Sequence, residues 1–220
     1  MPDTTDRPRP ATFRARPRLI EKVVARAEKH IDALRYRSWF ANGEFTTDWT
    51  TGNFTRWRRM LRPWRDQPLR VLEVGSWEGR SAVFFLKFFP RASIVCIDAF
   101  NEFPEIEGRF DRNLAPFGAR VEKIKSVSFP ALEALHAAGR TFDLVYIDAH
   151  HFYEPVRDNS LRAWPLTVPG SVIIWDDYGW GRGHPDEKRA KTAVDEFLAA
   201  RLNAYRLLAM GYQVAIERIA

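Results

Sequence analysis

Acidic and histidine side chains follow two apolar stretches of the chain, at points where strands of a sheet would end. The stretch FDLVYIDAHH closes in Asp148, His150 and His151. The apolar part of GSVIIWDDYGW runs directly into Asp176 and Asp177. Three carboxylates brought together would repel one another and raise one another's pKa unless a proton or a cation neutralises them. Oxygen ligands of this kind suit Mg²⁺, Ca²⁺ or Mn²⁺, and a histidine can serve as a base near neutral pH.

A regular alternation of strand-like and helix-like runs would position these side chains. Strands are predicted at Val71–Val74, Ile94–Ile97, Val121–Ile124, Leu144–Ile147 and Val172–Trp175. Helices are predicted at Arg80–Phe89, Glu105–Leu114, Ala131–Ala138, Val156–Trp164 and Asp186–Leu202. This alternation predicts an α/β, Rossmann-like doubly wound fold with a mostly parallel sheet covered on both faces. Two last strands, Tyr205–Met210 and Tyr212–Ile219, meet at Gly211 and predict an antiparallel C-terminal hairpin, giving seven strands. In such a sheet the carboxyl ends of the parallel strands share one crevice, where ligands bind.

The N-terminal part and the composition suggest three regions in one soluble protein of 220 residues. Residues 1–18 read as a basic, Pro/Arg-rich tail, residues 19–65 as a helical lid segment, and residues 66–220 as the α/β domain that would hold the ligand crevice. In the lid segment, helices are predicted at Leu19–Leu34 and at Phe54–Leu61, and Trp57, Leu61 and Trp64 are expected to point inward.

The composition argues against several classes of partner. The net charge of +6 accompanies no nucleic-acid-binding motif, so no nucleic acid is expected. No apolar run reaches the roughly 20 residues of a membrane span. The lone Cys96 cannot form an internal disulfide, and a cytoplasmic location is expected.

The stretch VLEVGSWEGRS predicts a strand, a tight loop and the start of a helix. Gly75 and Gly79 would let a ligand approach the backbone closely. The loop lacks both the dinucleotide fingerprint and the P-loop lysine, and Glu73 would repel phosphate, although it could hold a cationic group. Asp98, at the end of the second strand, could accept the hydroxyls of a ribose, or it could be a helix cap or turn residue. A cationic nucleoside without pyrophosphate, such as S-adenosylmethionine, meets these requirements.

Several motifs together resemble one family. The stretch LEVGSWEGRSAV looks like motif I of class I S-adenosylmethionine-dependent methyltransferases, and its form is similar to the catechol and caffeoyl-coenzyme A O-methyltransferase branch. The motifs FTTDWTTGNF, IDAHHFYEPV, DDYGW and GYQVAIER resemble the bacterial methyltransferase 24 group, so that the resemblance covers roughly residues 44–218. The resemblance implies an S-adenosylmethionine-dependent methyltransferase.

The resemblance also implies which residues bind the cofactor. The residues expected around it are Glu73, Gly75, Ser76, Trp77, Gly79, Ser81, Asp98, Ser126, Ser128 and Asp148. After the third strand many relatives carry an acid near the adenine, whereas this chain has Val127. The adenine would then rely on the backbone or on Ser126 or Ser128.

In the metal-dependent O-methyltransferases that the chain resembles, acids after the fourth and fifth strands bind a divalent cation. Asp148, Asp176 and Asp177 match those places, which implies Mg²⁺, or Ca²⁺ or Mn²⁺, although one of the adjacent pair could cap a turn. The cation would lower the pKa of a substrate hydroxyl and orient it. His151 stands where relatives place a catalytic lysine or histidine, and we prefer it to His150 as the base.

The substrate is expected to be a small molecule with a hydroxyl acceptor. The loop after the acidic pair offers four candidate contacts: Tyr178, Trp180, Arg182 and His184. Four aromatic residues of the lid segment, Trp39, Phe40, Phe45 and Trp49, could cover the site or pack in the core. The protein could form a homodimer. Two other functions stay open: a metal-independent methyltransferase acting on nitrogen or on a macromolecule, and a non-catalytic domain that binds the cofactor as a partner protein.

Overall fold

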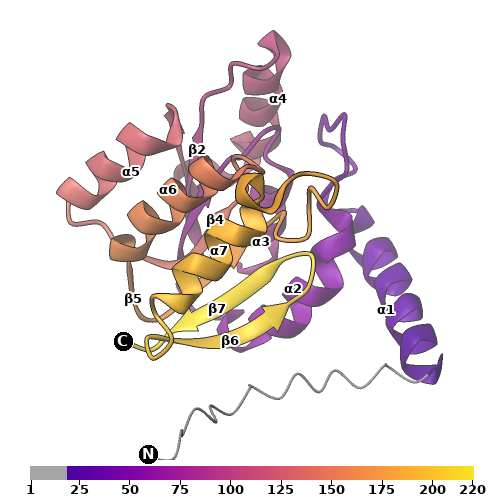
Figure 1. Ribbon diagram of the computed structural model, residues 1–220. Helices are drawn as coiled ribbons and strands as arrows, with labels where there is room; N and C mark the ends of the chain where they lie inside the picture. The colour runs from indigo at the N-terminus through magenta and orange to yellow at the C-terminus, as the bar shows by residue number, and fades with distance from the viewer. Residues whose placement is uncertain (1–18) are drawn as a thin grey trace, which may run out of the picture.

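A seven-stranded sheet forms the centre of the computed structural model, which describes residues 19–220. Figure 1 shows this sheet among the helices. The strands are β1 (Arg70–Val74), β2 (Ser93–Asp98), β3 (Val121–Lys125), β4 (Phe142–Ile147), β5 (Thr167–Trp175), β6 (Tyr205–Met210) and β7 (Val214–Arg218). Their order is β3-β2-β1-β4-β5-β7-β6, and β1 to β5 are parallel. β7 runs antiparallel to both β5 and β6. The predicted doubly wound fold with its C-terminal hairpin is confirmed.

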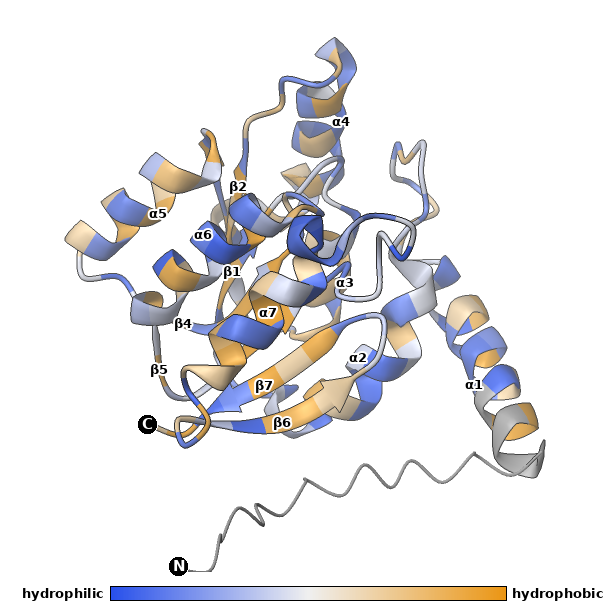
Figure 2. Ribbon diagram, in the orientation of Figure 1, coloured by the Kyte–Doolittle hydropathy of each residue, from blue (hydrophilic) through white to orange (hydrophobic). Residues whose placement is uncertain are grey.

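Helices cover both faces of this sheet, and their apolar sides form two cores. The helices are α1 (Leu19–Arg37), α2 (Phe54–Leu61), α3 (Arg80–Phe88), α4 (Pro104–Leu114), α5 (Ser128–Ala137), α6 (Tyr153–Ala163) and α7 (Ala190–Ala199). Residues of α1 to α4 pack in one core with Val71 and Tyr146 of the sheet. Residues of α5, α6 and α7 pack in the other with Leu72 and Val145. The middle of β7 is accordingly hydrophobic, whereas α4 and α6 alternate between hydrophobic and hydrophilic residues (Figure 2).

The N-terminal helices belong to the first of these cores. Phe54, Trp57 and Leu61 of α2 are at most 1% exposed, so the prediction that Trp57 and Leu61 point inward is confirmed. Trp64 is partly buried and packs against the same core. Within residues 19–220, no helix has the length and apolarity needed to cross a membrane. The predicted tail, residues 1–18, lies outside the described residues.

Two predicted boundaries near the C-terminus are wrong, and both errors lie beside the acidic side chains. The predicted helix Asp186–Leu202 is a short turn at Asp186–Lys188 followed by α7. Arg189 between them is extended (φ −99°, ψ 143°), because it forms a β-bridge with Phe152.

The second error concerns the hairpin turn. The prediction joined the two last strands at Gly211, but the strand after the turn begins only at Val214. Tyr212 and Gln213 leave the strand pairing because their side chains donate hydrogen bonds to Asp177 and Asp176.

Candidate active site

The loop after β1 is shaped by its glycines and lies against the end of β4. Gly75 has φ +90° and its N–H donates to the Ile97 carbonyl at 2.8 Å. A Cβ atom added to Gly75 would come within 2.5 Å of the Asp148 carbonyl oxygen. Only glycine therefore lets this loop approach β4 so closely. The strand order changes direction between β1 and β4, which is where an open α/β sheet forms its ligand crevice.

Asp98 fixes the shape of this loop from the end of β2. Its Oδ2 accepts hydrogen bonds from the N–H groups of Ser76 (2.8 Å) and Trp77 (2.9 Å). Its Oδ1 accepts one from the N–H of Phe100 (2.7 Å). The structure thus gives Asp98 the turn-forming contacts that the sequence left open. Since an ionised carboxylate has about four acceptor sites, one stays open toward the cavity.

Glu73 lies behind the loop and not on the cavity wall. It is fully buried, and its Oε2 accepts a weak hydrogen bond from the Cys96 thiol at 3.6 Å. Among the described residues its Oε1 has no hydrogen-bond partner. Burial raises the pKa of Glu73 to about 7, against the opposing effect of the nearby Ser81 and Ser76 hydroxyls. A buried acceptor without a donor fits a cationic group or a water molecule bound beneath the loop.

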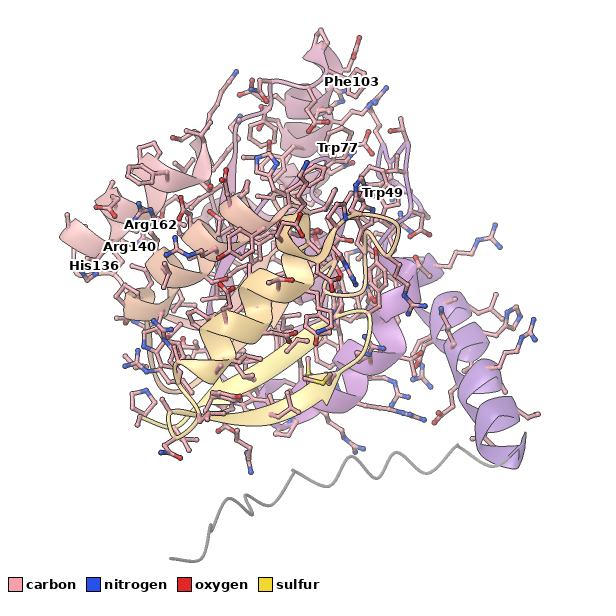
Figure 3. The ribbon with its side chains drawn as sticks, in the orientation of Figure 1. Trp49, Trp77, Phe103, His136, Arg140 and Arg162 are labelled. Atoms are coloured by element: carbon pink, nitrogen blue, oxygen red, sulfur yellow. The ribbon has the colours of Figure 1, made fainter. Side chains whose placement is uncertain are left out.

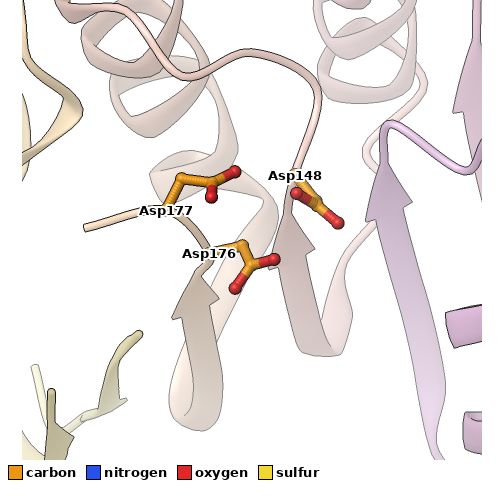
Figure 4. A group of neighbouring side chains, drawn as sticks. All are labelled: Asp148, Asp176 and Asp177. Carbon is orange, nitrogen blue, oxygen red and sulfur yellow. The ribbon is translucent and has the colours of Figure 1, made fainter. Parts of the chain in front are cut away.

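Three carboxylates meet at the ends of β4 and β5 (Figure 4). Asp148, Asp176 and Asp177 each offer an oxygen, and these oxygens lie within 4.8 Å of one another. They converge because Ile147 and Trp175, the last residues of the two strands, are register partners. Asp177 has φ +42°, a conformation that an aspartate tolerates better than most residues. The sequence prediction that these three residues come together is confirmed.

The charges of the acidic group are unequal. Burial and then the charge of Asp176 raise the pKa of Asp148 well above its usual range. Burial and the charge of Asp177 raise the pKa of Asp176. Burial also acts to raise the pKa of Asp177, but hydrogen bonds from His151 and Tyr212 outweigh it and the pKa is lowered. His151 Nδ1 lies 2.6 Å from Asp177 Oδ2, and this hydrogen bond raises the pKa of the imidazole.

Three hydrogen-bond donors to this group escaped the sequence analysis: Tyr146, Tyr212 and Gln213. The Tyr146 hydroxyl lies 2.9 Å from Asp148 Oδ2 and 3.1 Å from Asp176 Oδ2. Tyr212 donates to Asp177 and Gln213 to Asp176, each at 2.6 Å. The signal for Tyr146 was its place two residues before Asp148, on the same face of a strand. Tyr212 and Gln213 belong to the motif GYQVAIER, which supported the family resemblance but gave no indication of a role for either side chain.

The donor set fits a divalent cation. Among the described residues no lysine or arginine forms an ion pair with the three carboxylates, and the Tyr146 hydroxyl has one proton for two oxygens. The remaining negative charge requires protons or a cation. All the candidate ligand atoms are carboxylate oxygens, which Mg²⁺ and related ions prefer.

One cavity of about 700 Å³ connects the glycine loop to the acidic group. The predicted site residues on its wall are Gly75, Ser76, Trp77, Ser81, Asp98, Ser126, Ser128, Asp148, His151, Asp176, Asp177 and Trp180. His150 also lines it. Of the other predicted residues, Glu73 and Gly79 lie behind the wall, and Arg182 and His184 are exposed outside it. The structure turns Tyr178 away from the cavity, because its hydroxyl donates to Asp195 of α7 at 2.8 Å.

A strap of N-terminal residues, Glu44–Asn53, closes one side of the cavity. Thr47, Trp49, Thr50 and Asn53 of the strap line the cavity. Trp49 lies against Trp77 of the glycine loop with ring centroids 5.7 Å apart, and Trp77 lies against Phe103 at 6.0 Å (Figure 3).

The other aromatic residues of the lid segment behave differently from Trp49. Phe40 is only 8% exposed and packs in the core together with Trp39 and Phe45. Of the two predictions for these residues, covering the site applies to Trp49, and packing in the core applies to the other three.

Glu78, which the sequence analysis passed over, holds the strap in place. It is 1% exposed, and its two oxygens accept hydrogen bonds from the hydroxyl and the N–H of Thr46, both at 2.7 Å. Arg109 of α4 donates to the same carboxylate at 3.0 Å. A second pair, Asp48 with Arg80, joins the strap to the start of α3. No pattern in the sequence indicated that a residue inside the glycine loop would bind the N-terminal segment.

Comparisons with known proteins agree with this geometry. The chain is similar to the O-methyltransferase hkm8 of Aspergillus hancockii, with 31% identity over 114 residues, covering 50% of this chain and 43% of that protein. MycE, the methyltransferase of the mycinamycin biosynthetic pathway solved with Mg, SAH and mycinamycin VI, has a TM-score of 0.64 at 20% identity. The match covers 86% of this chain and 54% of MycE. The O-methyltransferase TomG of Streptomyces achromogenes, in complex with SAM, has a TM-score of 0.61 at 19% identity over 88% and 90% of the two chains.

The length of the matches limits what they establish. The chain spans about half the length of the fungal relative and of MycE. At 20% identity or less, the two solved structures establish the fold alone. The family model for the methyltransferase domain of the methyltransferase 24 group matches residues 72–178, from the third residue of β1 to the residue after the acidic pair. That segment contains the glycine loop, Asp98 and all three carboxylates, and over it, slightly less than half of its length, the chain is similar to the methyltransferase 24 family.

Proposed function

We propose that the protein transfers the methyl group of S-adenosylmethionine to a hydroxyl of a small molecule, with a divalent cation bound by Asp148, Asp176 and Asp177. The observation that carries this proposal is the single cavity that joins the glycine loop to the acidic group. A methyl donor and an acceptor oxygen must meet in line, which requires that both sites open into one space. The related proteins named O-methyltransferases support the same class of reaction.

The cofactor would lie along the glycine loop. Gly75, Ser76 and Trp77 offer backbone that comes close to a ligand, and the open acceptor site of Asp98 would take a ribose hydroxyl. Ser126 and Ser128 line the cavity and would stand near the adenine, with exposed Val127 between them in place of an acid. The unpaired oxygen of Glu73 would attract the cationic end of the ligand, through a water molecule beneath the loop.

His151 is suited to accept the proton of the acceptor hydroxyl. Its Nδ1 is hydrogen-bonded to Asp177, which fixes the neutral tautomer with a lone pair on Nε2. S-adenosylmethionine, when bound, would supply the methyl group with its carbon–sulfur bond as the one that breaks, and Nε2 of His151 would take the proton that the acceptor hydroxyl gives up. The cation, when bound, would lower the pKa of that hydroxyl and orient it. Trp180 packs against His151 with centroids 5.2 Å apart and would hold the imidazole in place.

Two measurements test the proposal in sequence. Calorimetric titration with S-adenosylmethionine in magnesium buffer should give saturable binding with a micromolar Kd, and absence of binding at millimolar ligand would reject the cofactor. Methyl transfer to a panel of small hydroxyl compounds should then depend on Mg²⁺ and stop in chelator. Full turnover in chelator would reject the metal and favour the metal-independent alternative. A homodimer, a cytoplasmic location and the division at residues 65 and 66 stay predictions.

A further inference from the structure

A buried chain of hydrogen bonds connects the N-terminal helix α2 to the acidic group. Trp57 of α2 is fully buried, and its indole Nε1 donates to Gln213 Oε1 at 2.9 Å. Gln213, 1% exposed, donates from Nε2 to Asp176 Oδ1 at 2.6 Å. The chain therefore joins three segments that are far apart in the sequence: α2, the turn between β6 and β7, and the end of β5.

The chemistry of the indole fixes the direction of this chain. An indole N–H is a donor only, so the amide oxygen of Gln213 must face Trp57. The NH₂ group of Gln213 must then face Asp176, whose oxygen can only accept from it while the carboxylate is ionised. One oxygen of Asp176 is therefore held by the amide. The other, Oδ2, lies on the side of Asp148, since the Tyr146 hydroxyl lies within 3.1 Å of both Oδ2 atoms.

The packing around Trp57 keeps the chain rigid. The Trp57 ring lies edge-on to Tyr146 with centroids 5.3 Å apart, and 4.9 Å from the ring of Phe85. The same indole thus supports two donors to the acidic group, Tyr146 by packing and Gln213 by a hydrogen bond. Because Gln213 is neutral, it orients the carboxylate without cancelling the negative charge that would attract a cation.

We infer that Trp57 and Gln213 are positioning residues for the divalent cation, and that they fix the Asp176 carboxylate with Oδ2 turned toward Asp148. This inference rests on the proposed metal role of the acidic group. Hydrogen-bond partners of metal ligands commonly change metal affinity by about 10–100-fold when removed. The N-terminal helix α2 is therefore part of the metal site through its Trp57 side chain, although none of its residues is a ligand.

The test is the affinity for Mn²⁺ of the full chain, measured by electron paramagnetic resonance without cofactor or acceptor. Trp57→Phe keeps a ring in the core but removes the donor, and Gln213→Met keeps the length of the side chain but removes both hydrogen bonds. Each should weaken Mn²⁺ binding by about 10-fold. The matched control is Trp175→Phe, since the equally buried indole of Trp175 donates to Ser160 Oγ at 2.8 Å in the opposite core. It should leave Mn²⁺ binding within about 2-fold of wild type.

The outcomes separate this inference from the proposed function. If the wild-type protein binds Mn²⁺ and both Trp57→Phe and Gln213→Met bind it with the same affinity, the inference is overturned but the metal site is not. A wild-type protein that binds no Mn²⁺ at millimolar concentration would overturn both. Equal weakening in Trp57→Phe and Trp175→Phe would mean a general loss of packing, which also rejects a positioning role. If Gln213→Met does not fold, Trp57→Phe and its control decide the question alone.

Discussion

The two ends of the cavity are built from different parts of the chain. At the glycine loop the main chain forms the site. Gly75 lies against the end of β4, and the N–H groups of Ser76 and Trp77 donate to Asp98. At the acidic group the main chain only ends two strands, and side chains supply the charges and the donors. They come from β4, from the segments that follow β4 and β5, and from the turn between β6 and β7. The first end should thus be sensitive to added atoms, and the second to changes of charge.

The electrostatic state of the two ends differs in the same way. At the glycine loop the carboxylate of Asp98 is balanced by three N–H groups, and that of Glu78 by Thr46 and Arg109. The acidic group holds two carboxyls, Asp148 and Asp176, whose pKa values are raised by burial and by neighbouring charges. Raised carboxyl pKa values mean that the ionised group costs stability in the folded protein. We expect that these carboxylates lower the stability of the fold because they are needed for function. The following substitutions test that expectation.

The largest effect is expected for Asp148→Asn. The amide keeps the shape and can still accept from Tyr146, but it removes a charge from the ligand set. Removing a hydrogen-bond partner of a metal ligand typically lowers metal affinity or activity by about 10–100-fold. Removing a ligand itself should cost more, so turnover should fall by more than about 100-fold. The metal-free protein should unfold at a higher temperature than wild type, because a repelling charge is gone. The two results together would mean that the Asp148 carboxylate is needed for turnover and lowers the stability of the metal-free fold.

Steady-state turnover and thermal unfolding in chelator measure both parts of this expectation. His150→Gln serves as the control, since His150 lines the cavity on the same loop but, within the described residues, forms no hydrogen bond or ion pair with the carboxylates. Turnover near the wild-type value in Asp148→Asn would remove the metal from the mechanism. A lower unfolding temperature would give the carboxylate a structural role instead.

Gly75→Ala should have the next largest effect. A left-handed backbone costs an alanine about 1–2 kcal/mol, and overpacking costs about 1–3 kcal/mol more. Gly139→Ala is the matched control, because Gly139 also has positive φ but no atom lies within 4 Å of its added Cβ. Urea unfolding should thus give about 2–5 kcal/mol for Gly75→Ala and about 1–2 kcal/mol for Gly139→Ala. Equal losses in the two variants would mean that the loop moves away from β4 without cost.

The sequence predicted the acidic group better than its surroundings, and the reason is physical. Strand ends are marked by the change from apolar to polar residues, so Asp148, Asp176 and Asp177 could be assigned to one edge of the sheet. The partners of these residues come from segments whose position depends on tertiary packing. Tyr212 and Gln213 could be read only as strand residues, because nothing local shows that their side chains leave the ladder to reach Asp177 and Asp176.

The strap was harder still to predict. Its link to the glycine loop joins Thr46 to Glu78, 32 residues away, and it depends on a carboxylate that looked like an ordinary loop residue. The helix break at Arg189 has the same origin, since it follows from a bridge to Phe152 on another loop. Local periodicity carries no information about such pairings, whereas it does define the strands and the amphipathic helices.

Glu78→Gln should have a moderate effect, confined to the cofactor end of the cavity. The amide cannot accept at both oxygens, so it loses either the Thr46 N–H or the Thr46 hydroxyl and Arg109. The loosened strap should weaken binding of S-adenosylmethionine by about 10-fold, which corresponds to about 1.4 kcal/mol, with Mn²⁺ affinity unchanged. Glu44→Gln is the control, because Glu44 joins the same strap to Arg112 through an exposed ion pair. Calorimetry on both variants checks this, and an equal loss in Glu44→Gln would show that no single anchor holds the strap.

The smallest effect is the pH dependence of stabilisation by Mg²⁺. The folded pKa values of Asp148 and Asp176 lie above the ordinary value of about 4. Their cost to metal-free stability is absent below that value and grows as the pH rises through the folded pKa values. Mg²⁺ replaces these protons, and it must also displace the proton that Asp177 stabilises on His151. Stabilisation by Mg²⁺ should therefore increase from pH 5 to pH 8.

Thermal unfolding with and without Mg²⁺ measures this difference. At about ten times Kd the ion should raise Tm by about 3–6 °C at pH 8 and by less at pH 5. Glu73, with its pKa of about 7, titrates in both measurements and cancels in the difference. Asp148→Asn should abolish the increase, because one of the two raised carboxyls is gone. If the rise in Tm caused by Mg²⁺ is the same at every pH in the wild-type protein, Mg²⁺ binds elsewhere. The difference in charge between the two ends of the cavity would then have no role in binding a cation.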